Sequence, residues 1–141
     1  NASMGVIVAA PTAGSSGVVP GVLLALQEEY QLKDEEILNG LYTAGAVGYL
    51  LMRNASVAGA EAGCQAEVGA ASAYAAAAAV EVMGGSPQMC LDAASTALSN
   101  LLGLVCDPVA GLVEAPCQTR NSMGSAMLLC VRSRRWPVWC R

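Results

Sequence analysis

Residues 65–83 read QAEVGAASAYAAAAAVEVM, and this alanine-rich stretch decides the fold class. Alanine is the strongest helix former and loses no side-chain entropy when a helix forms. Gly84 and Gly85 follow directly, which is typical of the end of a helix. The stretch therefore predicts a helix. Across the chain, hydrophobic residues make up 55% and aromatic residues only 4%, so we expect helices that approach closely across small side chains.

Capping and turn residues divide the rest of the chain into further helices. Proline is tolerated in the first turn of a helix, so Pro20 favours a helix start close to it. Asp34, followed by two glutamates, is a good N-cap with an acidic first turn. The predicted elements are helices over about 18–30, 34–52, 87–102 and 119–130, and a strand or the end of a helix over 4–10. The predicted fold class is therefore all-α, a compact bundle of Ala-rich helices in one domain.

The apolar stretches are too short or too interrupted to predict a membrane protein. Prolines and glycines break the uncharged segment 2–27, and the uncharged segment from Ile37 to Met52 has only 16 residues. A helix that spans a membrane needs roughly 20 apolar residues in a row. The chain does not open with a basic segment of the kind that begins a signal peptide. We therefore expect a cytoplasmic protein without a membrane partner.

The charges are distributed unevenly along the chain. Residues 1–131 carry three basic side chains against eleven acidic ones, whereas residues 132–141 add four arginines and both tryptophans. An acidic body with so few basic residues argues against nucleic-acid binding. The abrupt change in composition predicts that 132–141 is an atypical basic tail outside the fold, of the kind that a frameshift or a truncation produces.

The chain has six cysteines and no histidine. Without histidine, this chain alone cannot build Ser–His–Asp or Cys–His catalysis or a His-ligated zinc site. Cys64, Cys106 and Cys117 fall at predicted helix ends or in loops, where a metal can reach them, whereas Cys90 is predicted to be a core residue. Clustered cysteines in a reducing compartment often bind metal, but free cysteine is also a common buried apolar residue. From the residues alone, three ligands and three core cysteines remain equally open.

Three long strings resemble a known family. They are PTAGSSGVVPG (11–21), NASVAGAEAGCQAEVGAASA (54–73) and LGLVCDPVAGLVEAPCQTRNSMG (102–124). Over roughly residues 1–124 the chain looks like the α portion of the iron–sulfur-dependent L-serine dehydratases. The resemblance implies that Cys64, Cys106 and Cys117 hold a 4Fe–4S cluster through three of its irons.

The resemblance further implies that L-serine is converted to pyruvate and ammonia. The fourth iron would be open and would act as a Lewis acid on the hydroxyl group that leaves. Pyridoxal phosphate is not required, and Lys33, the only lysine, lies in a charge-rich stretch typical of a surface. In many family members the α portion works beside a β subunit or β domain, so we expect such a partner and an oligomer.

Polar residues close to these strings are candidates for substrate binding. A Gly/Ser loop that leads into a helix can bind anions through its backbone N–H groups. The resemblance therefore suggests that Thr12, Ser15 and Ser16 bind the substrate carboxylate together with loop amides. Asn54 is a further candidate for contact with substrate or cluster.

Other polar side chains are candidates for supporting roles. Ser56 and Gln65 are close in sequence to the first cysteine and are candidates for hydrogen bonds to cluster sulfurs or substrate. Glu61, Glu67 and Glu114 are candidate proton acceptors, although caps and surface charges fit each of them better. The sequence does not identify the base.

Two alternative functions stay open at this point. A related lyase of the cysteine desulfidase type resembles the same α fold and also releases pyruvate and ammonia. The second alternative is an inactive fragment that binds a cluster loosely or not at all. The expected organisation is a partial iron–sulfur-binding catalytic domain over 1–131 and the atypical tail over 132–141, with the chain beginning inside the family's α portion and stopping before its usual end.

Overall fold

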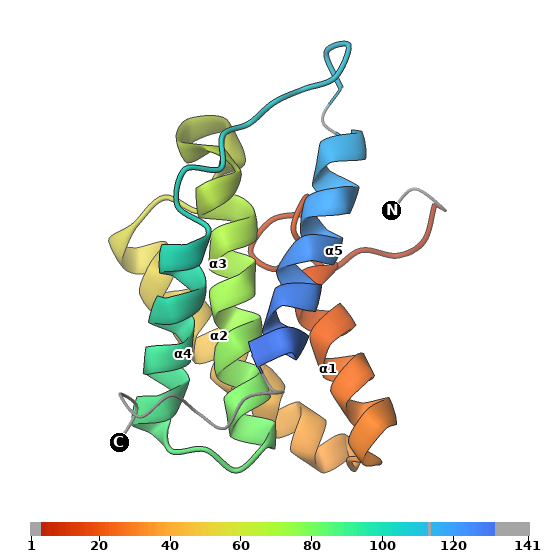
Figure 1. The fold of residues 1–141 in the computed structure, drawn as a ribbon, viewed down its shortest axis with the longest axis vertical. Helices are drawn as coiled ribbons and strands as arrows, with labels where there is room; N and C mark the ends of the chain where they lie inside the picture. Colours follow the sequence, from red (N-terminus) through yellow and green to blue (C-terminus); the bar gives the residue numbers. More distant parts are fainter. Residues whose placement is uncertain (1–3, 113, 132–141) are drawn as a thin grey trace.

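The computed structural model describes residues 4–112 and 114–131, and its regular elements are helices (Figure 1). They are α1 (Val18–Tyr30), α2 (Asp34–Asn54), α3 (Gly59–Val82), α4 (Pro87–Asn100) and α5 (Glu114–Val131). The described residues form no β-sheet, and Val109 and Leu112 make only an isolated bridge. The predicted all-α fold class is confirmed. The tail predicted over 132–141 lies outside the described residues.

Helix α3 lies at the centre of the bundle and contacts each of the other four helices (Figure 1). Residues 70–78, most of them alanine, are all buried. A helix that is apolar on every side is stable only in an interior, because it has no polar face to turn toward water. The alanine-rich stretch thus explains both the fold class and the central place of this helix.

Glycines allow the outer helices to approach α3 closely. A Cβ atom added to Gly40 of α2 would lie 2.7 Å from Cγ1 of Val82. A Cβ atom added to Gly124 of α5 would lie 2.7 Å from Oγ of Ser72. Protein interiors are packed as densely as organic crystals, so neither position has room for another methyl group. The core is filled by close backbones in place of large side chains, as the composition predicts.

The N-terminal residues 4–10 form neither a strand nor a helix, so that prediction is wrong. Val6 and Val8 are 99% and 80% exposed. A single extended segment leaves its backbone groups unpaired unless a second strand lies beside it, and none does among the described residues. The apolar composition of this segment does not by itself create an element.

The starts of α2 and α4 agree closely with the sequence signals. Helix α4 begins directly after Ser86, whose Oγ accepts a hydrogen bond from the backbone N–H of Met89 at 3.4 Å. Helix α2 begins at Asp34 with Lys33 in the N-cap position, one residue before the predicted cap. The Glu36 carboxylate accepts a hydrogen bond from the Lys33 backbone N–H at 2.8 Å, so the acidic first turn still caps the helix.

Helix α3 begins before the predicted start and contains a kink. Its first turn begins at Gly59, six residues before the predicted helix over 65–83. Ala62 (φ −129°, ψ 15°) and Gly63 (φ 74°, ψ −178°) interrupt the helix, which continues from Cys64. The conformation of Gly63 is accessible almost only to glycine. The predicted long helix is therefore the straight part that follows the kink.

Helix α5 begins at Glu114, earlier than the predicted start at residue 119. Cys117 consequently lies in its first turn, at the end of a helix, and not in a loop before a helix that starts at residue 119. Pro116 is compatible with this position because the N–H groups of a first turn have no acceptor within the helix. The two cysteines at the ends of CDPVAGLVEAPC thus belong to different elements, a loop and a helix.

No helix in the described part of the chain has both the length and the apolar composition that crossing a membrane requires.

Candidate metal centre

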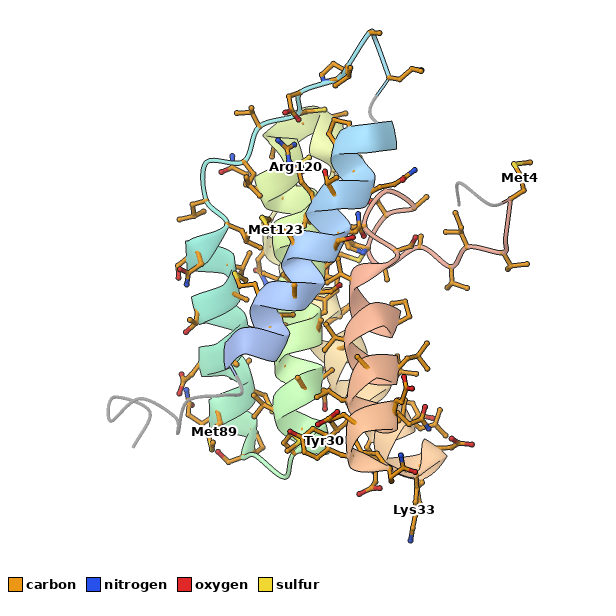
Figure 2. The ribbon with its side chains drawn as sticks, turned by 45° about the vertical axis from the view of Figure 1, so that its right-hand side comes forward. Met4, Tyr30, Lys33, Met89, Arg120 and Met123 are labelled. Carbon is orange, nitrogen blue, oxygen red and sulfur yellow. The ribbon has the colours of Figure 1, made fainter. Side chains whose placement is uncertain are left out.

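The three cysteines singled out in the sequence meet at a pocket at one end of the bundle. Cys64, Cys106 and Cys117 all line this pocket. They come from α3, from the loop between α4 and α5, and from the first turn of α5. Figure 2 places this end of the bundle, marked by Arg120, away from the end that carries Lys33. The fold thus gathers thiols that are far apart in the sequence.

The loop between α4 and α5, residues 101–112, is attached to α3 by Gln65. The backbone N–H of Gln65 donates to the carbonyl oxygen of Leu104 at 2.8 Å, and the N–H of Gly103 donates to Oε1 of Gln65 at 2.9 Å. Gly63 provides the space for this contact, because a Cβ atom there would lie 2.8 Å from the Leu104 oxygen. The side-chain oxygen of Gln65 therefore holds the loop that carries the second cysteine.

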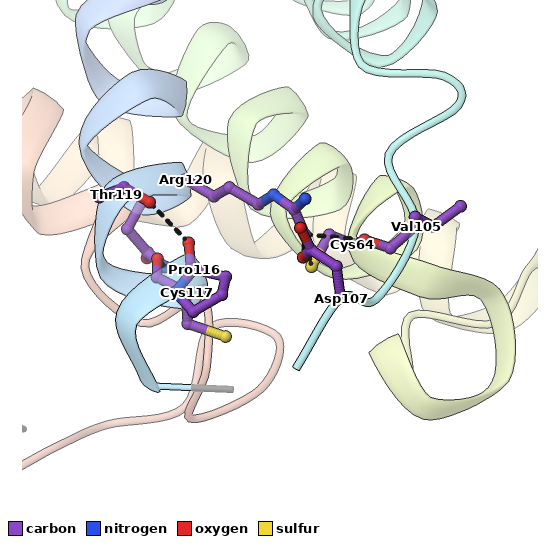
Figure 3. A network of polar contacts seen from close by, with 8 residues as sticks. Cys64, Val105, Asp107, Pro116, Cys117, Thr119 and Arg120 are labelled. Atoms are coloured by element: carbon purple, nitrogen blue, oxygen red, sulfur yellow. Dashed lines mark hydrogen bonds and ion pairs between the residues drawn. The ribbon is translucent and has the colours of Figure 1, made fainter. Parts of the chain in front are cut away.

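Arg120 reaches from α5 to the other two cysteine-bearing segments (Figure 3). Its Nη1 lies 3.0 Å from Sγ of Cys64, 2.7 Å from the carbonyl oxygen of Val105 and 2.7 Å from Oδ1 of Asp107. The hydrogen bond to Cys64 is the largest cause that raises the pKa of Arg120 above its usual value, so the guanidinium stays charged. Sequence reasoning missed this contact. The available signal was a basic residue three positions after Cys117 in an otherwise acidic chain.

The three thiols differ in their surroundings. Cys64 is buried, Cys117 is partly buried and Cys106 is exposed, and all three are free. Burial is the largest cause that raises the pKa of Cys117, and negative charge on Cys64, Glu67 and Cys106 raises it further, whereas Arg120 lowers it. Because a metal binds the thiolate, binding must displace the proton that these effects retain. The charge of Arg120 favours that step.

Among the glutamates whose side chains are described, Glu67 is the one that lines the pocket. Its carboxylate accepts a hydrogen bond from Oγ1 of Thr12. Gly14 and Gly59 leave room for the carboxylate, since a Cβ atom at either position would collide with its oxygens. Thr12, predicted to bind substrate, does not itself line the pocket, and its observed contact orients Glu67.

The two serines of the predicted substrate loop do not line the pocket either. Ser15 is buried, and its Oγ donates to the carbonyl oxygen of Ala10 at 3.3 Å. The Oγ of Ser16 donates to the carbonyl oxygen of Ala13 at 2.8 Å. Each of these hydroxyl protons is used on a backbone carbonyl of residues 10–17, so both side chains shape this segment in the arrangement observed.

Asn121 attaches the loop 11–17 to α5, which the sequence did not reveal. Its Nδ2 donates to the carbonyl oxygens of Gly14 and Cys117, each at 2.7 Å. Its Oδ1 accepts a hydrogen bond from the N–H of Gly17 at 3.3 Å. An amide side chain one helical turn after a candidate ligand was the only signal. These bonds bring the loop 11–17 beside the first turn of α5.

The remaining polar candidates lie outside the pocket lining. The Nδ2 of Asn54 donates at 2.7 Å to a carbonyl oxygen one turn earlier in α2, and the Ser56 hydroxyl donates to the Glu61 carboxylate. The side chain of Glu114 is not among those described. Of the two candidate glutamates whose side chains are described, Glu61 and Glu67, only Glu67 lines the pocket with the cysteines.

The donor set consists of soft sulfur ligands of the kind that iron–sulfur clusters take. Among the described residues, no three histidine, cysteine or acidic side chains are gathered closely enough to hold one metal ion. Ligands of an iron–sulfur cluster bind different irons, so they surround a larger object than one ion does. Three free thiols that line one pocket, with soft sulfur donors throughout, match that requirement.

Residues 1–130 match the family described as serine dehydratase alpha chain. A probable L-serine dehydratase alpha chain of Bacillus subtilis (strain 168) is 56% identical over 126 residues, which cover 89% of this chain and 42% of that protein. The L-serine dehydratase alpha chain of Peptoniphilus asaccharolyticus is 56% identical over 124 residues, 88% of this chain and 42% of that protein. An L-serine dehydratase of Escherichia coli (strain K12) is 44% identical over 127 residues, 89% of this chain and 28% of that protein. This chain thus spans less than half of the length of these relatives.

Proposed function

This chain belongs to the serine dehydratase alpha chain family, and on that premise we propose that it is the cluster-bearing part of an iron–sulfur-dependent L-serine ammonia-lyase. The reaction eliminates water from L-serine, and hydrolysis of the resulting enamine then consumes one water, so the net products are pyruvate and ammonia. The observation that carries the proposal is the convergence of Cys64, Cys106 and Cys117 on one pocket from three separate segments. Both alpha chains compared above are named for L-serine dehydratase.

In this proposal the three cysteines hold a 4Fe–4S cluster, and pyridoxal phosphate takes no part. When bound, such a cluster supplies an iron with an open position that acts as a Lewis acid on the hydroxyl group that leaves. Arg120 is the only cation among the described residues that line the pocket, and it offsets the negative charge of the thiolates. It thereby favours the ligating form of the cysteines.

We assign the role of proton acceptor to Glu67. A general base must lie within reach of the substrate, and Glu67 lines the pocket whereas Glu61 is bonded to Ser56 outside it. Thr12 holds the Glu67 carboxylate in place. The neighbouring loop 11–17 remains the predicted site for the substrate carboxylate, with its backbone amides as the donors, because the hydroxyls of its serines are bonded to backbone carbonyls of residues 10–17.

The proposal includes a partner and a compartment. The relatives named alpha chain imply a β subunit beside this chain, and we expect the complete enzyme to be an oligomer that contains it. We propose the cytoplasm as the compartment, where thiols stay reduced and can bind a metal.

The test is the amount of iron and acid-labile sulfide per chain after anaerobic reconstitution. We expect about four of each for the unaltered chain and a loss in Cys64→Ser, Cys106→Ser and Cys117→Ser. Cys90→Ser is the matched control, because Cys90 is buried in α4 and its Sγ contacts the Glu81 carboxylate away from the pocket. A chain that is folded by circular dichroism but takes up no iron contradicts the proposal.

Turnover of L-serine is then measured with the β partner present. Glu67→Gln is expected to retain the cluster and to lose most of the activity, since it removes the proton acceptor and keeps the shape of the side chain. Glu61→Gln is the matched control and is expected to retain activity. Equal activities of the two variants would contradict the assignment of Glu67.

A further inference from the structure

A single side chain connects all three segments that carry the cysteines. Arg120 stands one turn after Cys117 in α5, and its Nη1 contacts Sγ of Cys64 in α3. The same nitrogen contacts Val105 and Asp107, the two residues that flank Cys106 in the loop. Figure 3 shows the guanidinium extending from α5 to this loop.

The contacts of Arg120 are strong because they involve charge and partial burial. The side chain of Arg120 is 17% exposed, whereas that of Asp107 is 54% exposed. A hydrogen bond from a cation is stronger than one between neutral groups, and the carbonyl of Val105 accepts such a bond at 2.7 Å. The ion pair with Asp107 is more open to water and therefore weaker. The contact with Cys64 is partly buried, whereas the hydrogen bond to Val105 is exposed and gains its strength from the charge of the donor.

Few other contacts hold this loop. Val105, Val109 and Leu112 are each more than half exposed, so apolar burial contributes little to its position. The described attachments are the hydrogen bonds of Gln65 to Gly103 and Leu104, at the beginning of the loop. Beyond them, Arg120 is the next described attachment toward Cys106.

We infer that Arg120 is a positioning residue that docks the 101–112 loop against α3 and so holds Cys106 and Cys64 at the pocket before any metal binds. The inference rests on the proposed function only in taking these cysteines as ligands. The docking itself belongs to the chain without metal and can be measured there. Asp107 has a secondary part, because it engages the guanidinium from the exposed side.

The test is backbone hydrogen exchange of the full chain without metal, read at the amides of Gly103 and Gln65, whose hydrogen bonds join the loop to α3. Arg120→Gln is expected to speed their exchange about tenfold, because the loop opens more often. Arg120→Lys keeps the positive charge but loses the planar guanidinium, so its exchange rates are expected to lie between those of the unaltered chain and those of Arg120→Gln. Asp107→Asn is expected to speed the exchange of these two amides by only about two- to threefold. Lys33→Gln, which removes an exposed cation at the far end of the bundle, is the matched control and is expected to leave both amides unchanged.

Exchange at residues 70–78 of α3 reports global opening in the same sample and is expected to stay unchanged. Unchanged exchange at Gly103 and Gln65 in Arg120→Gln overturns the inference. An acceleration at residues 70–78 equal to that at Gly103 and Gln65 also overturns it, because it shows a loss of stability of the whole domain. Iron uptake is measured separately on the same variants, with a lower fraction of loaded chains expected for Arg120→Gln. If the unaltered chain takes up no iron, the proposed function fails, while the exchange data still decide the docking role.

Discussion

The substitution Gly63→Ala tests whether the kink in α3 is needed to place the cysteines. Gly63 has φ 74° and ψ −178°, and it directly precedes Cys64. A Cβ atom there would lie 2.8 Å from the carbonyl oxygen of Leu104 and 3.2 Å from Cα of Val105. Both neighbours are backbone atoms, so they cannot rotate away as the end of a flexible side chain does.

Two effects add up in the expected loss of stability. Holding a residue other than glycine in this backbone conformation costs about 1–3 kcal/mol. Moving the loop away from the new methyl group costs about another 1 kcal/mol, at the lower end of what inserted methyl groups cost in packed sites. We therefore expect Gly63→Ala to lower the free energy of unfolding by about 2–4 kcal/mol, a large part of the total for a domain of this size.

The assay is urea unfolding followed by circular dichroism, with iron content after reconstitution as a second readout. Gly45→Ala is the matched control, because Gly45 lies in α2 with no atom within 4 Å of the added Cβ. It is expected to raise the free energy of unfolding by up to about 1 kcal/mol through helix propensity. A Gly63→Ala chain that unfolds within about 0.5 kcal/mol of the unaltered chain and still loads iron would refute the reasoning.

Three further predictions concern the bundle away from the pocket. Gly40→Ala places a methyl group 2.7 Å from Cγ1 of Val82. The cost of overpacking, about 1–3 kcal/mol, outweighs the gain of about 1 kcal/mol in helix propensity. Urea unfolding should therefore show that Gly40→Ala is less stable than Gly45→Ala, and equal stabilities would contradict the packing argument. Burial raises the pKa of Tyr74 to about 12, so between about pH 10 and pH 12 this tyrosine ionises only in the unfolded chain, and the free energy of unfolding falls by about 2–3 kcal/mol. The free energy of unfolding of Tyr74→Phe should therefore fall less over this pH range. Equal falls in the two chains would contradict the prediction. Ser86→Ala removes the N-cap of α4 and should cost about 1 kcal/mol in the same assay, whereas Ser86→Asp should be nearly neutral.

The fold class was predictable because its cause lies in local composition. The alanines of α3 leave no polar face, so the sequence alone indicates that this helix is the buried one. The start of α4 was equally local, since Ser86 caps the helix through its own neighbour Met89. The start of α5 lies five residues before the predicted one, because a first turn accepts a proline such as Pro116.

The candidate site was predictable only in part. The resemblance pointed to the three cysteines, and the structure brings them to one pocket. The roles of Arg120 and Asn121 could not be predicted, because their acceptors lie in segments far away in the sequence. Glu67 was one of three glutamates with no local feature to distinguish it. What distinguishes it is its place in the lining of the pocket, which only the folded chain creates.

The pocket therefore depends on a different kind of interaction from the one that holds the bundle. The helices are held by close packing around α3, which opens only when the whole domain unfolds. The loop that carries Cys106 exposes Leu102, Val105 and Val109, so it gains little from burial and depends on hydrogen bonds to Gln65 and Arg120. Polar contacts at a surface are individually worth only about 1 kcal/mol, so this loop can open while the bundle stays folded. Cys106 on such a loop can therefore change its position without unfolding of the bundle, which Cys90, buried in the packed core, cannot do.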